Sequence, residues 1–304
     1  MRIFVTGAEG QVARSLREAA TIDTTLVLGW GARPDVDLTQ PDTVHRAIDA
    51  FRPDLVINPA AYTAVDKAEA EPDLAFAINR DGAGAVAEAA AKAGAPIIQL
   101  STDYVFDGAK GGPYLEDDAP SPTGVYGQSK FAGERAVAAA NSRHVILRTA
   151  WVYAPFGGNF VRTMLRLAGD RDWLTVVDDQ IGCPTYAPDI ATAVLSIARL
   201  VQADGWRADY AGATNCAGPD AMSWCGFARA IVAGAAERGG RNIPVEAITT
   251  AQYPTPAKRP ANSRLDTGRL ASVFGVRMPP LEDSLGRCLD QLLGAPDDIE
   301  RTSR

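Results

Sequence analysis

The sequence of 304 residues contains few residues of the types that bind metals or form disulfides. It has four cysteines and two histidines. The cysteines, at positions 183, 216, 225 and 288, are widely separated and form no Cys-x-x-Cys pair. Zinc sites need closely grouped Cys and His ligands, and disulfide-stapled secreted domains need many more cysteines. The composition therefore predicts reduced, structural thiols and no metal site.

Basic charge and long apolar runs are also lacking. Asp and Glu outnumber Lys and Arg by 37 to 30, which gives a net charge of −7, and no cluster of basic residues occurs. Nucleic-acid and anionic-membrane surfaces need such clusters. No apolar run approaches the roughly 18 residues of a membrane span, and the opening residues MRIFVTG enter a strand pattern without a leader. We expect a cytoplasmic protein with no nucleic-acid partner and no membrane association.

The sequence does contain a regular alternation of apolar runs and alanine-rich segments. Five short aliphatic and β-branched runs, typical of strands buried on both faces of a parallel sheet, occur at 2–6, 24–29, 54–58, 96–101 and 144–149. Helices are expected at 10–20, 41–51, 73–93 and 126–140. This alternation predicts an α/β fold with a doubly wound parallel sheet of the Rossmann type.

The pattern loosens after residue 150, where stretches rich in Pro, Gly and Asn indicate long functional loops. A helix near 187–201 and a strand near 210–215 are expected to return to the sheet, and helices at 221–239 and 282–293 to build a smaller lobe. We predict a dinucleotide-binding domain over 1–152, with returning segments near 178–215. The segments 153–177 and 216–304 are assigned to a C-terminal substrate-binding lobe.

The first expected strand leads into the glycine-rich string TGAEGQVA. Gly7 permits a tight turn, and Gly10 permits close approach of a pyrophosphate. Gln11 and Val12 begin the next helix, whose backbone N–H groups and dipole favour an anion. These four residues are predicted to bind a dinucleotide. A glycine-rich turn without a ligand is the alternative.

The end of the second strand bears on the choice of cofactor. NAD-preferring sites usually carry an acidic residue there, and here positions 29–31 read Gly-Trp-Gly. Arg33 follows and can pair with a 2′-phosphate. This favours NADP(H), with NAD(H) as the alternative. Asp37, with Leu38 beside it, is expected on the adenine side, and Arg33 as a solvated loop charge is the competing interpretation.

Tyr126 and Lys130 stand four residues apart in GVYGQSK, so on a helix they share one face. Taken alone, such a pair is more typical of a half-buried ring beside a solvated ammonium. Ser101 and Thr102, however, end the fourth expected strand, at the edge where ligands of such sheets bind. The string NPAAYT, residues 58–63, follows the third strand. Three segments are therefore expected to line one crevice.

These motifs together resemble the extended short-chain dehydrogenase/reductases. Strings similar to those of dTDP-4-dehydrorhamnose reductases are NPAAYTAVDKAE (58–69), STDYVFDG (101–108), VYGQSKFAGE (125–134), RTAWVY (148–153), VVDDQIGCPT (176–185) and YPTPAKRPANSRL (253–265). The resemblance covers nearly the whole chain. It implies NADPH-dependent reduction of the C4 ketone of dTDP-4-dehydro-β-L-rhamnose, the last step of dTDP-L-rhamnose biosynthesis. The sequence leaves a monomer and a homodimer equally open.

The chemistry gives each residue of the crevice a role. Tyr126 protonates the carbonyl oxygen as general acid, and Lys130 lowers the pKa of that phenol and bonds the nicotinamide ribose. Thr102 donates a hydrogen bond to the carbonyl oxygen. By resemblance, further cofactor contacts are Ala61, Tyr62, Thr63 and Ser101, and further substrate contacts are Asp103, Trp151, Asn159 and Arg264.

Several alternatives stay open at this level. Trp151 can be a core residue at the domain junction, and Asn159 and Arg264 can be loop-stabilising residues. The enzyme can act on another dTDP-4-keto-deoxysugar. From a different class, the regulatory subunit of methionine adenosyltransferase resembles this family, so a non-catalytic NADP-binding subunit is a third possibility. The presence of Thr102, Tyr126 and Lys130 together favours catalysis.

Overall fold

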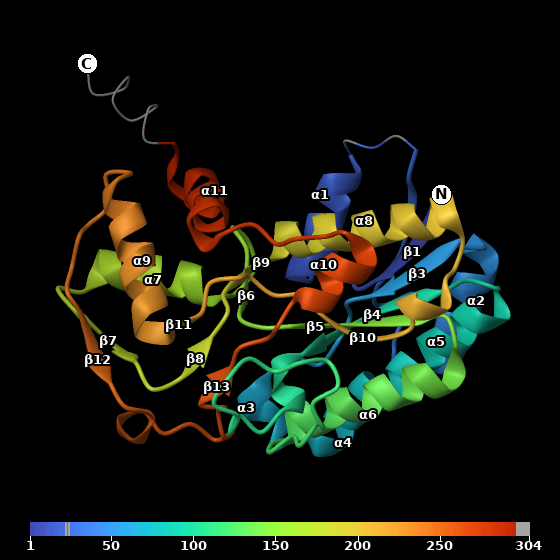
Figure 1. Ribbon diagram of the computed structural model, residues 1–304, viewed down its shortest axis with the longest axis horizontal. Coiled ribbons are helices and arrows are strands. Elements are labelled where there is room, and N and C mark those ends of the chain that lie inside the picture. Colours follow the sequence, from blue (N-terminus) through green and yellow to red (C-terminus); the bar gives the residue numbers. More distant parts are fainter. Residues whose placement is uncertain (22, 24, 296–304) are drawn as a thin grey trace.

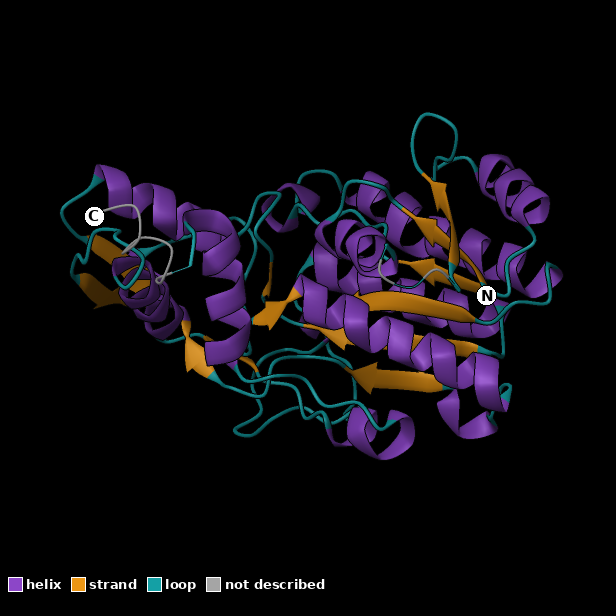
Figure 2. Cartoon of the chain, turned by 90° about the horizontal axis from the view of Figure 1, so that it is seen from above, coloured by secondary structure: helices purple, strands orange, loops and turns teal. Residues whose placement is uncertain are grey.

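A six-stranded parallel sheet forms the centre of the computed structural model, which describes residues 1–21, 23 and 25–295. The strand order is β10-β5-β4-β3-β1-β2. The strands are β1 (Arg2–Thr6), β2 (Val27–Gly31), β3 (Leu55–Asn58), β4 (Ile97–Thr102), β5 (His144–Thr149) and β10 (Gly212–Asn215). Helices cover both faces of the sheet (Figures 1 and 2). The predicted α/β fold with a doubly wound sheet is confirmed.

The apolar runs form strands because they are buried on both faces. Every residue of β3 and β4 is buried. β2 begins at Val27, later than the strand expected from 24, and Thr24 lies outside the described residues. In the register Val27 lies opposite Arg2, the first residue of β1, so β2 begins where its partner strand begins.

Two helical layers enclose the sheet. One consists of α1 (Gln11–Ala20), α8 (Ala187–Asp204) and α10 (Gly268–Phe274), and the other of α2 (Pro41–Phe51), α5 (Ala83–Lys92) and α6 (Val125–Ala140). Leu270 and Phe274 of α10 join the same apolar core as Ile3 and Val5 of β1. The sequence assigns 216–304 to the lobe, yet α10 packs on the sheet domain because these apolar side chains complete that core.

The single helix expected over 73–93 is interrupted. It consists of α4 (Pro72–Phe76), a π-helical turn η1 (Ala77–Gly82) and α5. Asn79 in the π turn is buried, accepts a hydrogen bond from the Tyr62 N–H at 2.8 Å and donates to the Ser129 hydroxyl at 3.0 Å. The π turn therefore ties the loop after β3 to α6, as such turns often do beside functional sites.

The smaller lobe lies beside the sheet domain, at the left of Figure 1. Its elements are β6 (Val152–Tyr153), α7 (Phe160–Asp170), β7 (Leu174–Val177), β8 (Ile181–Gly182), β9 (Thr185–Tyr186), β11 (Met222–Ser223), α9 (Trp224–Ala236), β12 (Val245–Ile248), β13 (Asn262–Ser263) and α11 (Leu281–Leu293). A separate core, which includes Tyr153, Phe227 and Leu285, holds its helices together. Residues 296–304 of the predicted lobe lie outside the described residues.

Short elements complete the chain, and one asparagine joins distant segments. The short elements are α3 (Val65–Ala68) and the 3₁₀ turns η2 (Asp103–Val105), η3 (Ala208–Tyr210) and η4 (Thr250–Gln252). The Asn215 amide at the end of β10 donates to the carbonyls of Tyr114 and Asp266, each at 2.9 Å. The edge strand is therefore fixed by two loops as well as by β5.

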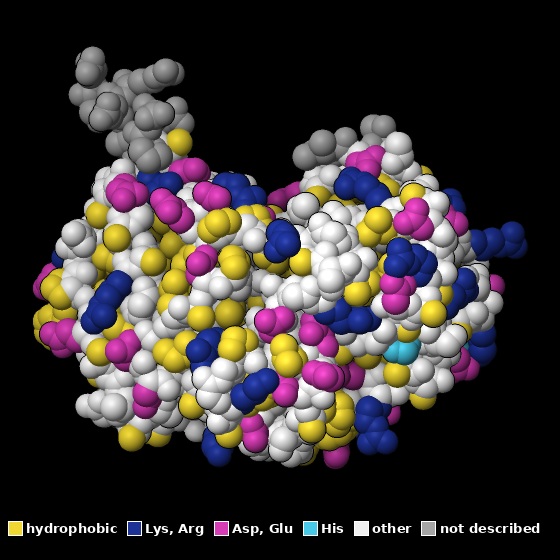
Figure 3. Space-filling view, viewed as in Figure 1, with side chains coloured by type: hydrophobic (Ala, Val, Ile, Leu, Met, Phe, Trp, Pro, Cys, Tyr) yellow, Lys and Arg dark blue, Asp and Glu magenta, His cyan; other side chains and the backbone are white. Residues whose placement is uncertain are grey.

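The surface carries both signs of charge. Basic and acidic side chains are interspersed over the face shown in Figure 3. Within 1–21, 23 and 25–295, no helix combines the length and apolar character needed to cross a membrane.

Candidate active site

The order in which successive strands are added to the sheet reverses at β1. β2 lies on one side of β1, and β3, β4, β5 and β10 follow on the other. Open parallel sheets bind ligands at the carboxyl ends of the strands beside such a switch point. The turns after β1, β3, β4 and β5 all begin at this edge, so the structure brings the glycine-rich turn, the 58–63 loop and Thr102 to the same edge of the sheet, and we call this group of residues the crevice.

The turn between β1 and α1 has the geometry of a phosphate-binding loop. Gly7 has a φ of +73°, and a Cβ atom there would lie 3.1 Å from the Ala60 side chain. Gly10 is the N-cap of α1 without a side-chain cap, and a Cβ atom there would meet nothing within 4 Å. The backbone N–H groups at Gln11 and Val12 open the first turn of the helix. A dinucleotide pyrophosphate fits this turn.

Asn159 links the lobe to the phosphate loop. It is the N-cap of α7, and its side-chain oxygen accepts a hydrogen bond from the Arg162 N–H at 3.2 Å. Its amide donates to the Gln11 side chain at 3.0 Å and to the Ala154 carbonyl at 2.8 Å. These contacts are those of a loop-stabilising residue, and contact of Asn159 with a substrate stays a prediction.

The residues predicted for the adenine side lie in the loop after β2. Arg33 is exposed. The Asp37 carboxylate accepts hydrogen bonds from the Thr39 N–H at 2.9 Å and the Thr39 hydroxyl at 2.8 Å, and these bonds lower the pKa of Asp37. Leu38 packs over Gly82 of the π turn, where a Cβ atom would lie 2.7 Å from the leucine side chain. Arg33 is therefore the residue of this group whose charge is open to a ligand.

The loop after β3, which contains Ala61, Tyr62 and Thr63, is held at Tyr62 by both its backbone and its side chain. Asn79 bonds both the N–H and the carbonyl of Tyr62, at 2.8 and 3.0 Å. The Tyr62 hydroxyl donates to Glu71 at 2.6 Å, which raises the pKa of Tyr62 to about 12. Sequence reasoning missed Asn79. The one signal available was a polar residue in the middle of an alanine-rich helix.

Thr102, Tyr126 and Lys130 meet where β4 ends and α6 begins. The Thr102 hydroxyl donates to Asp103 at 2.9 Å and accepts from the Tyr104 N–H at 3.2 Å. Buried Lys130 donates to the Leu100 carbonyl at 2.6 Å. The half-buried ring of Tyr126 packs edge-on against Tyr104, with 5.4 Å between ring centres.

Burial shifts the protonation equilibria of this group. Burial raises the pKa of the Tyr126 phenol, and a hydrogen bond with Thr102 opposes that shift. Burial lowers the pKa of Lys130 to about 8, against the opposing charge of Glu134. The sequence predicts a phenol whose pKa Lys130 lowers, whereas in this structure desolvation dominates. The protonated phenol is the form that a general acid needs.

Two buried polar atoms where β4 and β5 end have no hydrogen-bond partner among the described residues. They are Oδ2 of Asp103 and Oγ1 of Thr149. Thr149 stands opposite Thr102 in the β4–β5 register. Because a buried polar atom without a partner is costly, these two atoms fit contact with a ligand that carries hydroxyl groups.

Trp151 lies at the junction of the two domains. Its φ of +50° is unusual for a bulky residue, and this strained backbone lies next to the crevice. Its ring stacks on Trp224 of α9, with 3.5 Å between ring centres. A Cβ atom at Gly182 would lie 2.3 Å from the Trp151 indole. These contacts match packing at the junction, and stacking on a sugar ring stays a prediction. No motif or spacing in the sequence singles out Trp224.

Arg264 follows β13 and reaches the loop after η2. Its Nε donates to the Asn262 side chain at 2.8 Å, and its Nη2 donates to the Gly111 carbonyl at 2.7 Å. These bonds stabilise the two loops. A bond from Arg264 to the substrate stays a prediction.

A second arginine of the same loop connects the domains, and sequence reasoning missed it. Arg259 donates to Asp66 of α3 at 2.7 Å and to the Tyr104 hydroxyl at 3.0 Å. We call Asp66, Arg259 and Tyr104 the interdomain bridge. Because Tyr104 packs on Tyr126, the bridge connects the 251–264 loop to the crevice.

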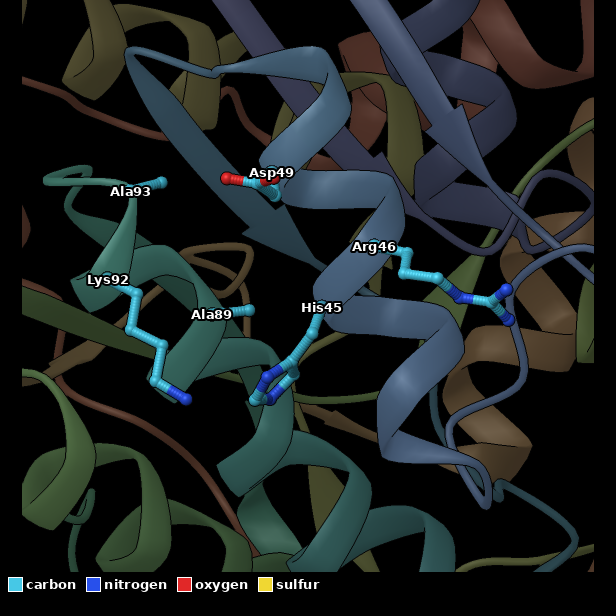
Figure 4. Close-up of a pocket in the computed structure, with 6 residues that line it drawn as sticks. All are labelled: His45, Arg46, Asp49, Ala89, Lys92 and Ala93. Carbon is cyan, nitrogen blue, oxygen red and sulfur yellow. The ribbon is translucent and has the colours of Figure 1, made fainter.

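A pocket elsewhere on the molecule lies between α2 and α5, lined by His45, Arg46, Asp49, Ala89, Lys92 and Ala93 (Figure 4). Lys92 ends α5 shortly before β4 begins at Ile97. The pocket is therefore near the amino end of β4, at the opposite end of the strands from the crevice. Nε2 of His45 has no partner within the described part of the chain.

The doubly wound sheet, the phosphate loop and the Thr, Tyr and Lys of the crevice define an extended short-chain dehydrogenase/reductase. The family described as RmlD substrate binding domain matches residues 1–293. The dTDP-4-dehydrorhamnose reductase of Sinorhizobium fredii is 51% identical over 96% of this chain and 98% of its own length. The chain belongs to the dTDP-4-dehydrorhamnose reductase family and is an oxidoreductase.

Solved structures agree with this assignment. A dTDP-4-dehydrorhamnose reductase from Clostridium acetobutylicum has a TM-score of 0.88 and 37% identity, over 96% of this chain and 99% of its own. The Bacillus anthracis reductase, solved in complex with NADP, has a TM-score of 0.86 and 34% identity, over 94% of this chain and 98% of its own. The resemblance and the enzyme class predicted from sequence are confirmed.

Proposed function

We propose that this protein reduces the C4 ketone of dTDP-4-dehydro-β-L-rhamnose with NADPH and so forms dTDP-L-rhamnose. The observation that carries the proposal is the convergence of Thr102, Tyr126 and Lys130 at the carboxyl edge beside the phosphate loop. The names of the relatives support the sugar substrate, and NADP in the B. anthracis structure supports the cofactor. The exposed charge of Arg33 supports NADPH over NADH.

Different residues bind the cofactor and act on the carbonyl group. Gly7, Gly10 and the first turn of α1 hold the cofactor pyrophosphate, and Lys130 holds the ribose. When bound, NADPH supplies the hydride that adds to C4. Tyr126 gives its phenolic proton to the ketone oxygen as the negative charge develops there, and Thr102 orients that oxygen.

The test follows NADPH absorbance after addition of dTDP-4-dehydrorhamnose, generated in place by the upstream enzymes, and identifies the sugar by mass spectrometry and NMR. We expect stoichiometric oxidation of NADPH and a product with the configuration of L-rhamnose. Oxidation only with another dTDP-ketosugar would assign the protein to a sister reductase. NADPH binding without oxidation by any such sugar would favour a regulatory subunit.

A further inference from the structure

We propose that Glu134 is a positioning residue of the crevice, whose buried carboxylate keeps Lys130 in its charged form and fixes Ser101 at the end of β4. Glu134 lies one helical turn after Lys130 on α6, just as Lys130 lies one turn after Tyr126. The inference rests on the proposed function, because it concerns residues assigned there to the cofactor and the carbonyl oxygen.

The Glu134 carboxylate is held rigidly from two other elements. Arg148 of β5 forms a two-pronged pair with it, at 2.9 Å from Nε to Oε1 and 2.7 Å from Nη2 to Oε2. Both side chains are only 5% exposed. The Ser101 hydroxyl donates to the same carboxylate at 2.6 Å, which fixes its rotamer beside Thr102. β4, β5 and α6 therefore meet at one buried carboxylate.

A buried ion pair is by itself weak support for a purely stabilising role, because apolar replacements are often neutral or stabilising. What distinguishes the Glu134–Arg148 pair is that Lys130 lies one helical turn from Glu134. Lys130 is buried, and its three N–H donors have one acceptor among the described residues, the Leu100 carbonyl. A buried ammonium without a nearby negative charge tends to lose its proton. The charge of Glu134 raises the pKa of Lys130 against that burial.

The titratable and charged groups of this part of the crevice come from three elements, and Glu134 is the one whose charge acts on Lys130. Glu134 and the phenol of Tyr126 lie on α6 itself, Arg148 comes from β5, and Asp103 comes from η2 and acts on Tyr126. Arg148 partly neutralises the field of Glu134, because the two are bonded. Removing Glu134 should therefore favour the neutral amine of Lys130, whereas removing Arg148 should not.

The test measures Lys130 directly. The chain has only five lysines, Lys67, Lys92, Lys110, Lys130 and Lys258, so ¹³Cε-lysine NMR resolves each titration. The variant Lys130→Arg assigns the signal. We expect a Lys130 midpoint near pH 8 in the unaltered protein. In Glu134→Gln we expect it to fall by about one pH unit, and in Arg148→Gln we expect no fall. The other four lysines serve as internal controls.

An unchanged Lys130 midpoint in Glu134→Gln would overturn the proposal and leave Glu134 a structural residue. The variant Glu134→Gln leaves Arg148 buried without its partner. The double variant Glu134→Gln/Arg148→Gln therefore replaces both charges with neutral side chains, and thermal unfolding checks that it folds. It too must show a lowered midpoint. The titration uses neither cofactor nor substrate, so its failure is distinguishable from failure of the proposed reduction. In assays, the alkaline limb of kcat/KM should move down with the midpoint.

Discussion

At the scale of single residues, the crevice places a phenol and an ammonium one helical turn apart, with the ammonium buried and the phenol ring half-buried. Burial favours the neutral form of each, so the phenol keeps its proton while the lysine is drawn toward the amine. The carbonyl of Leu100 and the carboxylate of Glu134 oppose that second tendency. The side chains that support Lys130 therefore matter for its charge as well as for its position.

The variant Tyr126→Phe removes the proposed proton donor and keeps the ring. We expect turnover to fall by roughly 10²–10⁴, the usual contribution of one general acid, with NADPH affinity nearly unchanged. Single-turnover kinetics and fluorescence titration measure the two quantities. The matched control is Tyr104→Phe, which keeps the ring that packs on Tyr126 and should lose far less. Undiminished turnover would remove Tyr126 from the mechanism.

The variant Arg33→Ala tests the choice of cofactor. Loss of a charge-assisted bond to the 2′-phosphate should weaken NADPH binding by about tenfold and leave NADH binding nearly unchanged. Isothermal titration with both cofactors measures the difference. Arg46 is an exposed arginine on α2, and the control variant Arg46→Ala should change the binding of neither cofactor. Equal weakening for both cofactors would contradict a role of Arg33 at the phosphate.

Asp103 gives a prediction about pH and stability. Burial raises its pKa to about 6, above the value near 3.9 of an unfolded chain. Between these values the folded state keeps a proton that the unfolded state has lost. Asp103 therefore lowers the free energy of unfolding as pH rises from about 4 to 6, by roughly 1.4 kcal/mol per unit.

The variant Asp103→Asn keeps an acceptor for the Thr102 hydroxyl and should remove this part of the pH dependence. Urea unfolding between about pH 4 and 7 measures it. Asp172→Asn, at a side chain that is 84% exposed, is the control for the same substitution outside the crevice. A profile for Asp103→Asn that parallels the unaltered protein would show that Asp103 does not hold its proton in the folded state.

The sequence predicts the crevice residues that stand in local patterns and misses those defined by distant contacts. Tyr126 and Lys130 are four apart, and Thr102 ends a recognisable strand, so period and strand position locate them. Asn79 and Arg148 act through partners on other elements. No spacing in the sequence reveals such partners, and only the folded chain brings them together.

At the scale of elements, α6 owes its position to two glycines. A Cβ atom at Gly127 would lie 2.1 Å from the Tyr104 carbonyl oxygen, and one at Gly133 would lie 2.0 Å from that of Asn79. Glycine inside a helix costs about 1 kcal/mol relative to alanine. Here it lets the helix approach the backbone of η1 and η2, which brings Tyr126 to the end of β4.

The variant Gly133→Ala should lower the free energy of unfolding by about 1–3 kcal/mol, because the methyl group must displace a backbone carbonyl. Denaturant titration measures the loss. The control is Gly169→Ala near the end of α7, where a Cβ atom would meet nothing within 4 Å. That change should stabilise the protein by about 0.5–1 kcal/mol. A neutral Gly133→Ala would show that the contact with Asn79 relaxes freely.

Helix and strand positions were predictable wherever hydrophobic period and flanking signals agree. The helix expected over 126–140 is α6 to within a residue, and α2 occupies its predicted range. The π turn within the helix expected over 73–93 was not predictable, since its cause is the contact of Asn79 with a loop and another helix. The short strands of the lobe have too few residues to show a period.

At the scale of the whole molecule, the two domains are joined by the interdomain bridge as well as by the chain. Asp66 accepts hydrogen bonds from Arg259 and from the Ala257 N–H at 3.2 Å. The variant Asp66→Asn keeps the shape but removes the charge, so the 251–264 loop should open more often. Tryptic cleavage after Lys258 should then be several-fold faster, because local opening exposes that bond.

Mass spectrometry of the fragments measures this cleavage, and Arg259 adds no competing site because Pro260 follows it. Asp172→Asn breaks an exposed ion pair with Arg241 within the lobe and serves as control. Equal cleavage rates in both variants would show that the bridge does not restrain the loop. Sequence reasoning predicted the sheet domain and a lobe, but not a pairing between residues 66 and 259, nor the return of α10 to the sheet.

The edge strand β10 has a consequence for the order of events during translation. It pairs with β5, and Asn215 at its end is fixed by carbonyls that include Asp266. The ribosome therefore releases β5 long before the partners that cover its free side. A nascent chain halted before residue 212 presents a bare apolar strand edge, the form that aggregates or recruits chaperones. Pairing of β10 with β5 therefore removes the strand edge through which a newly made chain would associate with other chains.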